Sequence, residues 1–208
     1  MHNQIEKRFI QSTLSVRSVE EGGTTARIIE GLAIPFGKPS LPLSDDKEFE
    51  FVEYINEAAF DKVLSDAGLE VMLLYSHDWD APLARRSAKR LEIKKTPEGI
   101  AFTAILPDTT RAQDLIKDIE AGNIQGNSFG FFPTRERWFV DENGVNTREI
   151  LEAELYEISP VVMPAYPDTT LAKRSYDLFR AAAKPATPAL NTRSNALKLL
   201  QLKLKTKD

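Results

Sequence analysis

Apolar and β-branched residues recur along the first half of the chain in short runs, a pattern typical of strands. The turn-forming clusters Glu21-Gly22-Gly23-Thr24 and Thr96-Pro97-Glu98-Gly99 each separate two such runs and predict hairpins. Residues 37–47 contain the glycine, prolines and charges of a surface loop. The predicted strands are residues 9–19, 26–34, 49–54, 69–75, 90–95 and 99–106.

Helical periodicity is clear in one segment after these strands. Thr110 and Gln113 have the spacing of a capping box, and Gly122 supplies a stop. A second, shorter helix is predicted over residues 57–67, and another from about residue 173. The apolar residues at i, i+3, i+4 and i+7 of the main helix are Ala112, Leu115, Ile116 and Ile119.

The second half of the chain predicts one long hairpin. Residues 124–140 favour a strand, Asp141-Glu142-Asn143-Gly144 favours a turn, and residues 146–163 favour a returning strand. If Asn143-Gly144 is the centre of a two-residue turn, residue 142 faces residue 145. This register places Ser128 opposite Ser159.

Length and composition predict a single soluble domain followed by a tail, and the many predicted strands with few helices make its class α+β. The chain has 208 residues and 42% hydrophobic content, which is ordinary for one packed core. We expect a flexible N-terminus over residues 1–8, a folded domain over 9–172 and a basic, partly disordered tail over 173–208. A linker at Lys184-Pro185-Ala186-Thr187-Pro188 and a Leu/Lys segment belong to that tail.

Charge is distributed unevenly between body and tail. Residues 171–208 hold nine Lys or Arg and two Asp, which give this segment a charge of +7. Since the net charge of the chain is −4, the remaining residues carry −11. A basic tail on an acidic body suggests a contact with an acidic partner or with the body, or a solvated end. The acidic body argues against a DNA-binding function.

The absence of cysteine excludes several classes of site. The chain has no disulfide framework, no thiolate zinc or iron–sulfur site and no cysteine nucleophile, and we expect no metal or cofactor. The first eight residues lack the apolar stretch of a signal peptide, and the longest strongly apolar run, residues 71–75, is too short to span a bilayer. We therefore expect a cytosolic protein without a membrane partner.

Ser128 is the candidate nucleophile. It lies between Gly126 and Gly130, and small flanking residues let a substrate backbone approach the attacking oxygen. A serine hydroxyl needs a neighbouring base, and His77, at the end of the predicted strand 69–75, is the plausible one. Considered alone, such a histidine is more often a surface or core residue than a catalyst.

Strand geometry selects Glu157 as the acid that orients the histidine. In the predicted register Glu157 is a diagonal neighbour of Ser128, at about 7–8 Å between α-carbons. Alternation along the strand places Glu157 on the same face as apolar residues, where a carboxylate needs a partner. The residues that share this face are Leu151, Ala153, Leu155, Ser159 and Val161.

Other assignments remain open at this point. Asp80 could orient the histidine instead, and Glu154 is a further acid on the returning strand, although it would face Pro133. A bulge near Pro133 would shift the register by one residue. Glu157 could also be a structural partner of Arg85 or Arg86.

The run from Gly126 to Gly130 also matches the G-x-S-x-G nucleophile elbow of α/β-hydrolases. In that fold the catalytic histidine follows the serine, whereas His2 and His77 both precede Ser128. The elbow also requires a helix after the serine, and the aromatic residues after Ser128 favour a strand. We therefore reject this interpretation.

The ordered set of motifs resembles the prohead serine proteases of tailed bacteriophages, which are related in fold to the herpesvirus assembly proteases. The resemblance covers roughly residues 9–172. The sequence departs from the family's pattern at two places where the family commonly has glycine: at Glu57 or Ala58, and at Ala84. These departures affect loop shape. The matching blocks are Gly31-Leu32-Ala33-Ile34-Pro35-Phe36, Glu53-Tyr54-Ile55-Asn56-Glu57-Ala58-Ala59-Phe60, Leu73-Leu74-Tyr75-Ser76-His77-Asp78, Gly126-Asn127-Ser128-Phe129-Gly130-Phe131, and residues 155–167.

This resemblance implies a mainly antiparallel, β-barrel-like core with a few flanking helices, as in the herpesvirus proteases. It also implies a Ser-His-acid endopeptidase that cleaves major capsid protein or scaffold extensions, and usually itself, inside the procapsid in the host bacterial cytoplasm. His77 and Ser128 match the family's histidine and serine blocks, and Glu157 matches the third by position. Self-association inside the procapsid is expected. The alternative function is a non-catalytic assembly or scaffolding factor whose basic tail binds coat protein.

Overall fold

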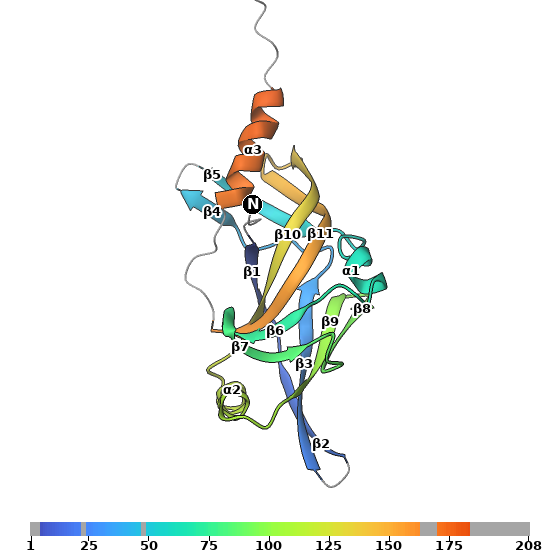
Figure 1. Ribbon diagram of the computed structural model, residues 1–208. Coiled ribbons are helices and arrows are strands. Elements are labelled where there is room, and N and C mark those ends of the chain that lie inside the picture. Colours follow the sequence, from blue (N-terminus) through green and yellow to red (C-terminus); the bar gives the residue numbers. More distant parts are fainter. Residues whose placement is uncertain (1–4, 22–23, 47–48, 163–169, 184–208) are drawn as a thin grey trace, which may run out of the picture. The chain divides into compact units, whose positions relative to one another are not determined.

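The computed structural model describes residues 5–21, 24–46, 49–162 and 170–183, and these are mostly strands with few helices (Figure 1). The chain divides into two units, residues 1–173 and residues 174–208. The strands are β1 (Glu6–Gln11), β2 (Ser15–Glu21), β3 (Thr24–Pro35), β4 (Leu43–Asp46), β5 (Phe49–Ile55), β6 (Met72–Tyr75), β7 (Asp78–Arg85), β8 (Leu91–Thr96), β9 (Gly99–Leu106), β10 (Gly126–Val140) and β11 (Asn146–Val161). The helices are α1 (Asp61–Ser65), α2 (Thr110–Glu120) and α3 (Thr170–Ala183).

The strands form two sheets. The larger sheet has the order β1-β10-β11-β5-β4, with β6 also paired to β11 and β7 paired to β6. The smaller sheet has the order β2-β3-β9-β8. The pairings are antiparallel except for those of β11 with β5 and with β6. Within the described residues neither sheet closes on itself, so the expected barrel-like core is corrected to two open sheets, and the relation to the herpesvirus proteases stays a prediction.

A single apolar core draws side chains from both sheets. Phe129 and Phe131 of β10 are almost fully buried, with ring centroids 5.1 Å apart, and Phe60 meets both rings edge-on. Ile29 of β3 and Phe102 of β9 belong to the same buried cluster. Each such side chain contributes about 1.5–3 kcal/mol on burial, so this core fixes β10 against the smaller sheet.

A cluster of buried charges holds the other end of the β10–β11 hairpin. Arg148 of β11 pairs with Glu6 at 2.8 Å and with Glu53 at 2.9 Å, and Arg8 pairs with both of these carboxylates. Glu136 also pairs with Arg148. We call these five residues the charge cluster. Burial alone would raise the pKa of Glu6, but hydrogen bonds and charges from Arg148 and Arg8 outweigh it and hold that pKa below its ordinary value.

The main helix forms almost where the sequence predicts it, but its cap is different. Thr109, not Thr110, accepts the capping hydrogen bond from the backbone N–H of Ala112. Gln113 donates to Asp108 instead of closing a capping box. Gly122 has a φ of +76°, as its predicted stop role requires.

Two strands were not expected from the sequence: β7 follows His77 directly, and β4 forms in the predicted loop 37–47. The predicted strand over residues 9–19 divides into β1 and β2, which belong to different sheets, and β1 begins at Glu6, inside the segment expected to be flexible. The predicted helix over residues 57–67 shortens to α1, and the predicted tail helix begins at Thr170. The linker at 184–188 and the Leu/Lys segment lie outside the described residues.

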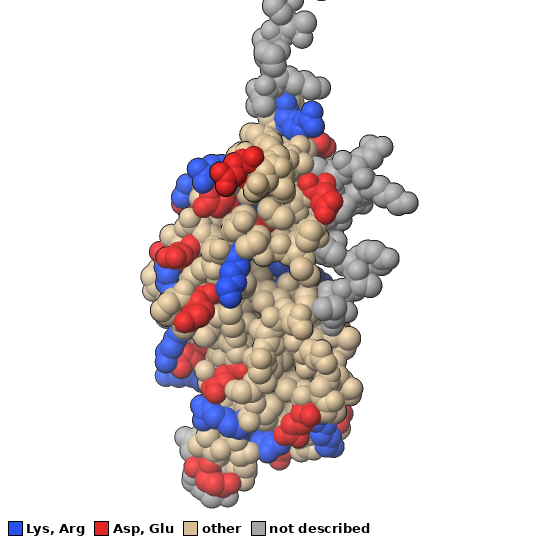
Figure 2. Space-filling model, turned by 180° about the vertical axis from the view of Figure 1, so that it is seen from behind, with Lys and Arg blue, Asp and Glu red and all other residues tan. Residues whose placement is uncertain are grey.

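On the face seen from behind, charged side chains gather along one edge and at the two ends, and a broad area beside them has none (Figure 2). No helix in the described part of the chain is long and apolar enough to cross a membrane.

Candidate active site

His77 lies in a strained turn between β6 and β7. Ser76 and His77 have φ values of +53° and +63°, a left-handed conformation that is uncommon for residues other than glycine. The surrounding structure must stabilise such a turn, because each residue in it is held in a costly conformation. The backbone N–H of Ser76 donates to the carbonyl of Pro160 at 3.2 Å, and that of His77 to the Ser159 hydroxyl at 3.1 Å.

Helix α2 supports the same turn from outside the sheet (Figure 1). The Tyr75 hydroxyl donates to Asp118 at 2.8 Å, just before the turn. Arg111 donates to the backbone carbonyl of Asp80 at 3.0 Å, just after it. Burial and the Asp118 hydrogen bond raise the pKa of Tyr75, so this phenol stays a donor at neutral pH. Residues on both sides of His77 are therefore fixed by one helix.

The structure brings His77 and Glu157 into direct contact. His77 Nδ1 and Glu157 Oε1 are 2.7 Å apart, with 18% of the His77 side chain and 1% of the Glu157 side chain exposed. A carboxylate on Nδ1 fixes the orientation and tautomer of the ring and leaves Nε2 free to exchange a proton. The pair therefore has the form of a general base with its orienting acid.

Ser128 lies on the neighbouring strand and is 2% exposed. In the observed register it pairs with Ser159 of β11 on one side and with Phe9 of β1 on the other. Glu157 pairs with Gly130, which makes Glu157 the diagonal neighbour of Ser128, as predicted. Among the described residues, the Ser128 hydroxyl and the His77 ring do not form a hydrogen bond.

The predicted register is found at Ser128, although the reasoning that led to it is wrong. β10 ends at Val140 and β11 begins at Asn146, so the loop has five residues instead of a two-residue Asn143-Gly144 turn. Near this loop the pairing is one residue out of the predicted register. A bulge near Pro133, the alternative from the sequence, and another after Gly130 shift the pairing again and restore it opposite Ser128.

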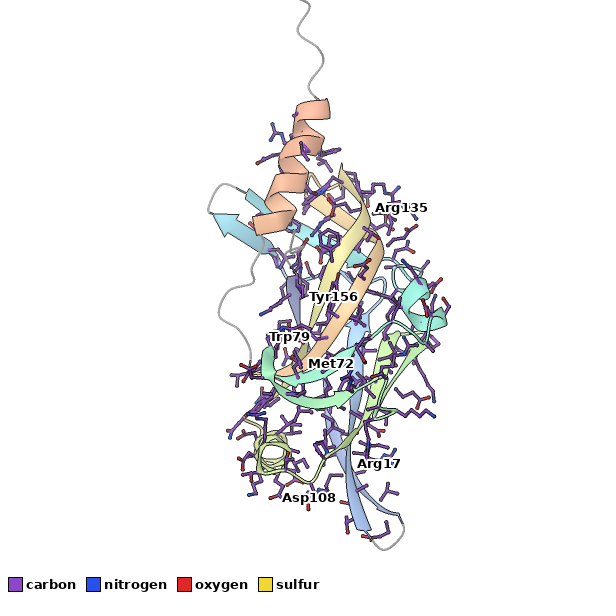
Figure 3. The ribbon with its side chains drawn as sticks, viewed as in Figure 1. Arg17, Met72, Trp79, Asp108, Arg135 and Tyr156 are labelled. Carbon is purple, nitrogen blue, oxygen red and sulfur yellow. The ribbon has the colours of Figure 1, made fainter. Side chains whose placement is uncertain are left out.

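The bulge after Gly130 places Glu157 on the face of the sheet opposite to the one predicted from strict alternation with Leu155. Leu155 and Ile158 both belong to the apolar core, although strict alternation would place them on opposite faces. Tyr156 is the extra residue opposite the shift, and it lies on β11 near Met72 of β6 (Figure 3). Glu157 is therefore buried on the face of Ser159 and Gly130, not on that of Leu155.

The two glycines around Ser128 have internal reasons for being small. A Cβ atom on Gly130 would overlap the Glu157 carboxylate, and one on Gly126 would come within 2.5 Å of the Ile10 carbonyl oxygen. Gly130 thus makes room for the acid beside the serine, and Gly126 lets β1 approach. Both reasons lie within the fold, whereas the sequence pattern indicates only room for a substrate backbone at these glycines.

The other acids make different contacts. Glu154 pairs with Phe132, not with Pro133, and accepts from the Tyr156 hydroxyl at 2.5 Å. This hydrogen bond raises the pKa of Tyr156 to about 12. Asp80 is exposed, and its backbone N–H donates to Asp78. Neither Glu154 nor Asp80 contacts His77.

The two arginines considered as structural partners of Glu157 are also engaged elsewhere. Arg85 pairs with Glu70 at 2.6 Å, and Arg86 donates to backbone carbonyls that include those of Asp66 and Leu69. The described residues contain no group of three or more His, Asp or Glu that could hold a metal ion.

Ser159 is the polar residue at this site whose contacts sequence reasoning missed. Its hydroxyl donates to Glu157 Oε2 at 2.5 Å and accepts from the His77 backbone, and the residue is 0% exposed. Two signals in the sequence could have found it: it follows Glu157 by two residues, and it was predicted to face Ser128.

The chain is similar to known proteins in sequence and in fold. A family model described as caudovirus prohead serine protease matches residues 12–181. No curated protein matches the chain. A solved structure, the bacteriophage T4 capsid assembly protease gp21, is similar with a TM-score of 0.54 at 12% identity, covering 77% of this chain and 98% of that chain. At this identity the structural likeness concerns the fold alone.

Proposed function

The chain belongs to the family of caudovirus prohead serine proteases, and from this premise we propose that it is a capsid maturation endopeptidase that uses Ser128, His77 and Glu157. The observation that carries this assignment is the contact of 2.7 Å between His77 and Glu157, diagonal to Ser128 on the paired strand. A buried carboxylate whose partner is an imidazole is the arrangement that general-base catalysis uses.

In the proposed mechanism, Ser128 Oγ attacks the carbonyl carbon of the scissile peptide while His77 Nε2 takes its proton. Glu157 remains ionised and stabilises the imidazolium. The peptide C–N bond then breaks as His77 returns the proton to the leaving amine, and an acyl-enzyme remains on Ser128. Water, deprotonated by His77, releases the acyl group and restores the hydroxyl.

The proposed mechanism requires a hydrogen bond between Ser128 and His77 that forms when substrate binds. Catalytic hydrogen bonds are often long before substrate binds and tighten in the complex. The His77 ring is held by Glu157, whereas the Ser128 hydroxyl has no hydrogen bond to it, so a side-chain rotation of the serine is the expected change. Substrate binding would favour the rotamers in which the two groups meet.

The proposed substrates follow from the family and from the structural neighbour, which is a capsid assembly protease. We assign major capsid protein and scaffold extensions as substrates, with processing of the chain itself. The reaction would take place inside the procapsid, in the host bacterial cytoplasm, with copies of this chain associated there.

Replacement of Ser128 by Ala tests this function. The variant should no longer cleave co-expressed capsid precursor in gels and mass spectra, and a fluorophosphonate probe should no longer label it. Ser18→Ala, which removes an exposed hydroxyl on β2, is the matched control and should cleave normally. Complete cleavage of the precursor by the Ser128→Ala variant would disprove the assignment.

A further inference from the structure

Ser159 makes two hydrogen bonds that join the proposed acid to the proposed base. Its hydroxyl hydrogen is donated to Glu157 Oε2 at 2.5 Å, and its oxygen accepts the backbone N–H of His77 at 3.1 Å. Glu157 Oε1 contacts the His77 ring. Each carboxylate oxygen therefore has its own partner, and the plane of the carboxylate is fixed.

The backbone contact matters because the turn at His77 is strained. Ser76 and His77 are both left-handed, and their consecutive N–H groups donate to two consecutive residues of β11, Pro160 and Ser159. Loss of the Ser159 acceptor would leave the His77 N–H without this partner and let the turn relax toward an ordinary conformation. The imidazole would move with it.

From this arrangement we infer that Ser159 is a positioning residue that locks Glu157 and His77 into one geometry opposite the nucleophile. The inference deepens the proposed function and rests on it. Ser159 faces Ser128 across the strand pair, so it lies between the acid, the base and the serine in the sheet. Its own proton is donated to Glu157 and not to the His77 ring, so the imidazole does not activate the Ser159 hydroxyl in this geometry.

A hydroxyl is suited to this role because it donates and accepts at the same time. A hydrogen bond from a hydroxyl to an ionised carboxylate is among the stronger neutral-to-charged contacts in proteins. An arginine in the same place would also hold the carboxylate, but it would neutralise the charge that the imidazolium needs. Ser159 orients Glu157 and leaves its charge available to His77.

The test is Ser159→Ala in the full chain, compared with Ser128→Ala and with Thr147→Val. Thr147 is also buried on β11, and its hydroxyl donates to a backbone carbonyl away from His77, so the valine variant deletes a buried hydroxyl on the same strand. We expect Ser159→Ala to lower kcat on the order of a hundredfold with KM nearly unchanged, as misplacement of a catalytic group does. Thr147→Val should keep its kcat.

A second readout does not depend on turnover. The chain has two histidines, so labelling with ¹⁵N-histidine leaves only two rings to assign, and the Nδ1–H proton of His77 in its carboxylate contact should resonate far downfield. We expect Ser159→Ala to shift or broaden this resonance and Thr147→Val to leave it in place. Ser159→Cys, which keeps the size but donates weakly, should behave like alanine and serves if the alanine variant does not fold.

The outcomes distinguish the positioning role of Ser159 from the protease function on which it rests. If Ser128→Ala abolishes cleavage while Ser159→Ala or Ser159→Cys retains the wild-type kcat and the downfield resonance, the positioning role is wrong and the protease assignment stands. If Ser128→Ala cleaves normally, the protease assignment fails as well.

Discussion

Two groups of buried polar side chains occupy different parts of the β10–β11 hairpin, and their carboxylates have different kinds of partner. In the charge cluster, the carboxylates of Glu6 and Glu53 meet the guanidinium groups of Arg8 and Arg148. In the candidate site, Glu157 is as deeply buried but meets only an imidazole and a hydroxyl.

The difference shows how this fold uses buried carboxylates. An arginine stays charged at every accessible pH, so the charge cluster is a permanent tie between β1, β5, β10 and β11. Burial alone would lower the pKa of Arg148, but Glu6 and the neighbouring carboxylates raise it instead. An imidazole can accept a proton and return it during a reaction, which a guanidinium group does not do. One group is suited to stability and the other to proton transfer.

The largest expected effect is on catalysis, when the charge of Glu157 in the candidate site is removed. Glu157→Gln keeps the shape but removes the charge opposite His77, and we expect kcat/KM to fall by about 10⁴-fold, as for a triad acid replaced by its amide. The free energy of unfolding should change little. Steady-state kinetics and urea denaturation of the same preparation measure both. A loss of less than tenfold would show that Glu157 is a structural residue.

The reciprocal change is in the charge cluster. Glu53→Ala leaves Arg8 and Arg148 buried with one carboxylate fewer, and we expect it to lower the free energy of unfolding by about 3–5 kcal/mol. Removal of Glu152 from its exposed pair with Arg135 is the control and should cost less than about 1 kcal/mol. If both variants cost the same in urea denaturation, the cluster contributes no more than a surface pair.

A smaller effect is expected where the backbone makes room for the acid. Gly130→Ala places a methyl group against the Glu157 carboxylate, so we expect a loss of about 1–3 kcal/mol in stability together with reduced kcat. Gly144→Ala also replaces a glycine of the hairpin, at a φ of +79°, but has open space around it. That variant should lose stability without a change in kcat. Equal kcat in the two variants would show that the site tolerates the displaced carboxylate.

The smallest effect is a dependence of stability on pH. The pKa of Glu6 is lower in the folded protein than its ordinary value of 4.5, so the unfolded chain binds this proton first. The stabilisation from Glu6 is therefore complete above pH 4.5 and is lost as the pH falls through the folded pKa. Urea denaturation between pH 7 and pH 3 should show this loss, and Glu6→Gln should have a flatter profile. Identical slopes would contradict the assignment.

The sequence predicted the two strands of the hairpin and helix α2 because regular alternation, glycine turns and helical periodicity are local signals. The assignment of Ser128, His77 and Glu157 as site residues stays a prediction, and the contact between His77 and Glu157 supports it. β7 and β4 were missed because Asp78, Trp79, Asp80 and Pro82 interrupt one and loop-forming residues surround the other. Their pairing is determined by neighbours distant in the sequence.

The remainder of the site depends on irregularities that no period reveals. The longer hairpin loop shifts the pairing by one residue from the predicted register. The bulge at Tyr156 shifts it back by one residue, so that the predicted pairing is found opposite Ser128. The left-handed turn at Ser76 and His77 contains no glycine, the residue that usually indicates such a turn in a sequence. Spacing places Ser159 beside Glu157 and opposite Ser128, but its hydrogen bond with the His77 backbone depends on the turn.

Strand β1 has a practical consequence for how the protein is produced. The segment that matches the family begins at residue 12, and an expression clone trimmed to that boundary would discard β1. Such a clone would strip two of the buried ionic partners of Arg148 and Glu53 and open the edge of β10 at the serine. Purification handles are therefore better attached where they leave residues 6–11 intact.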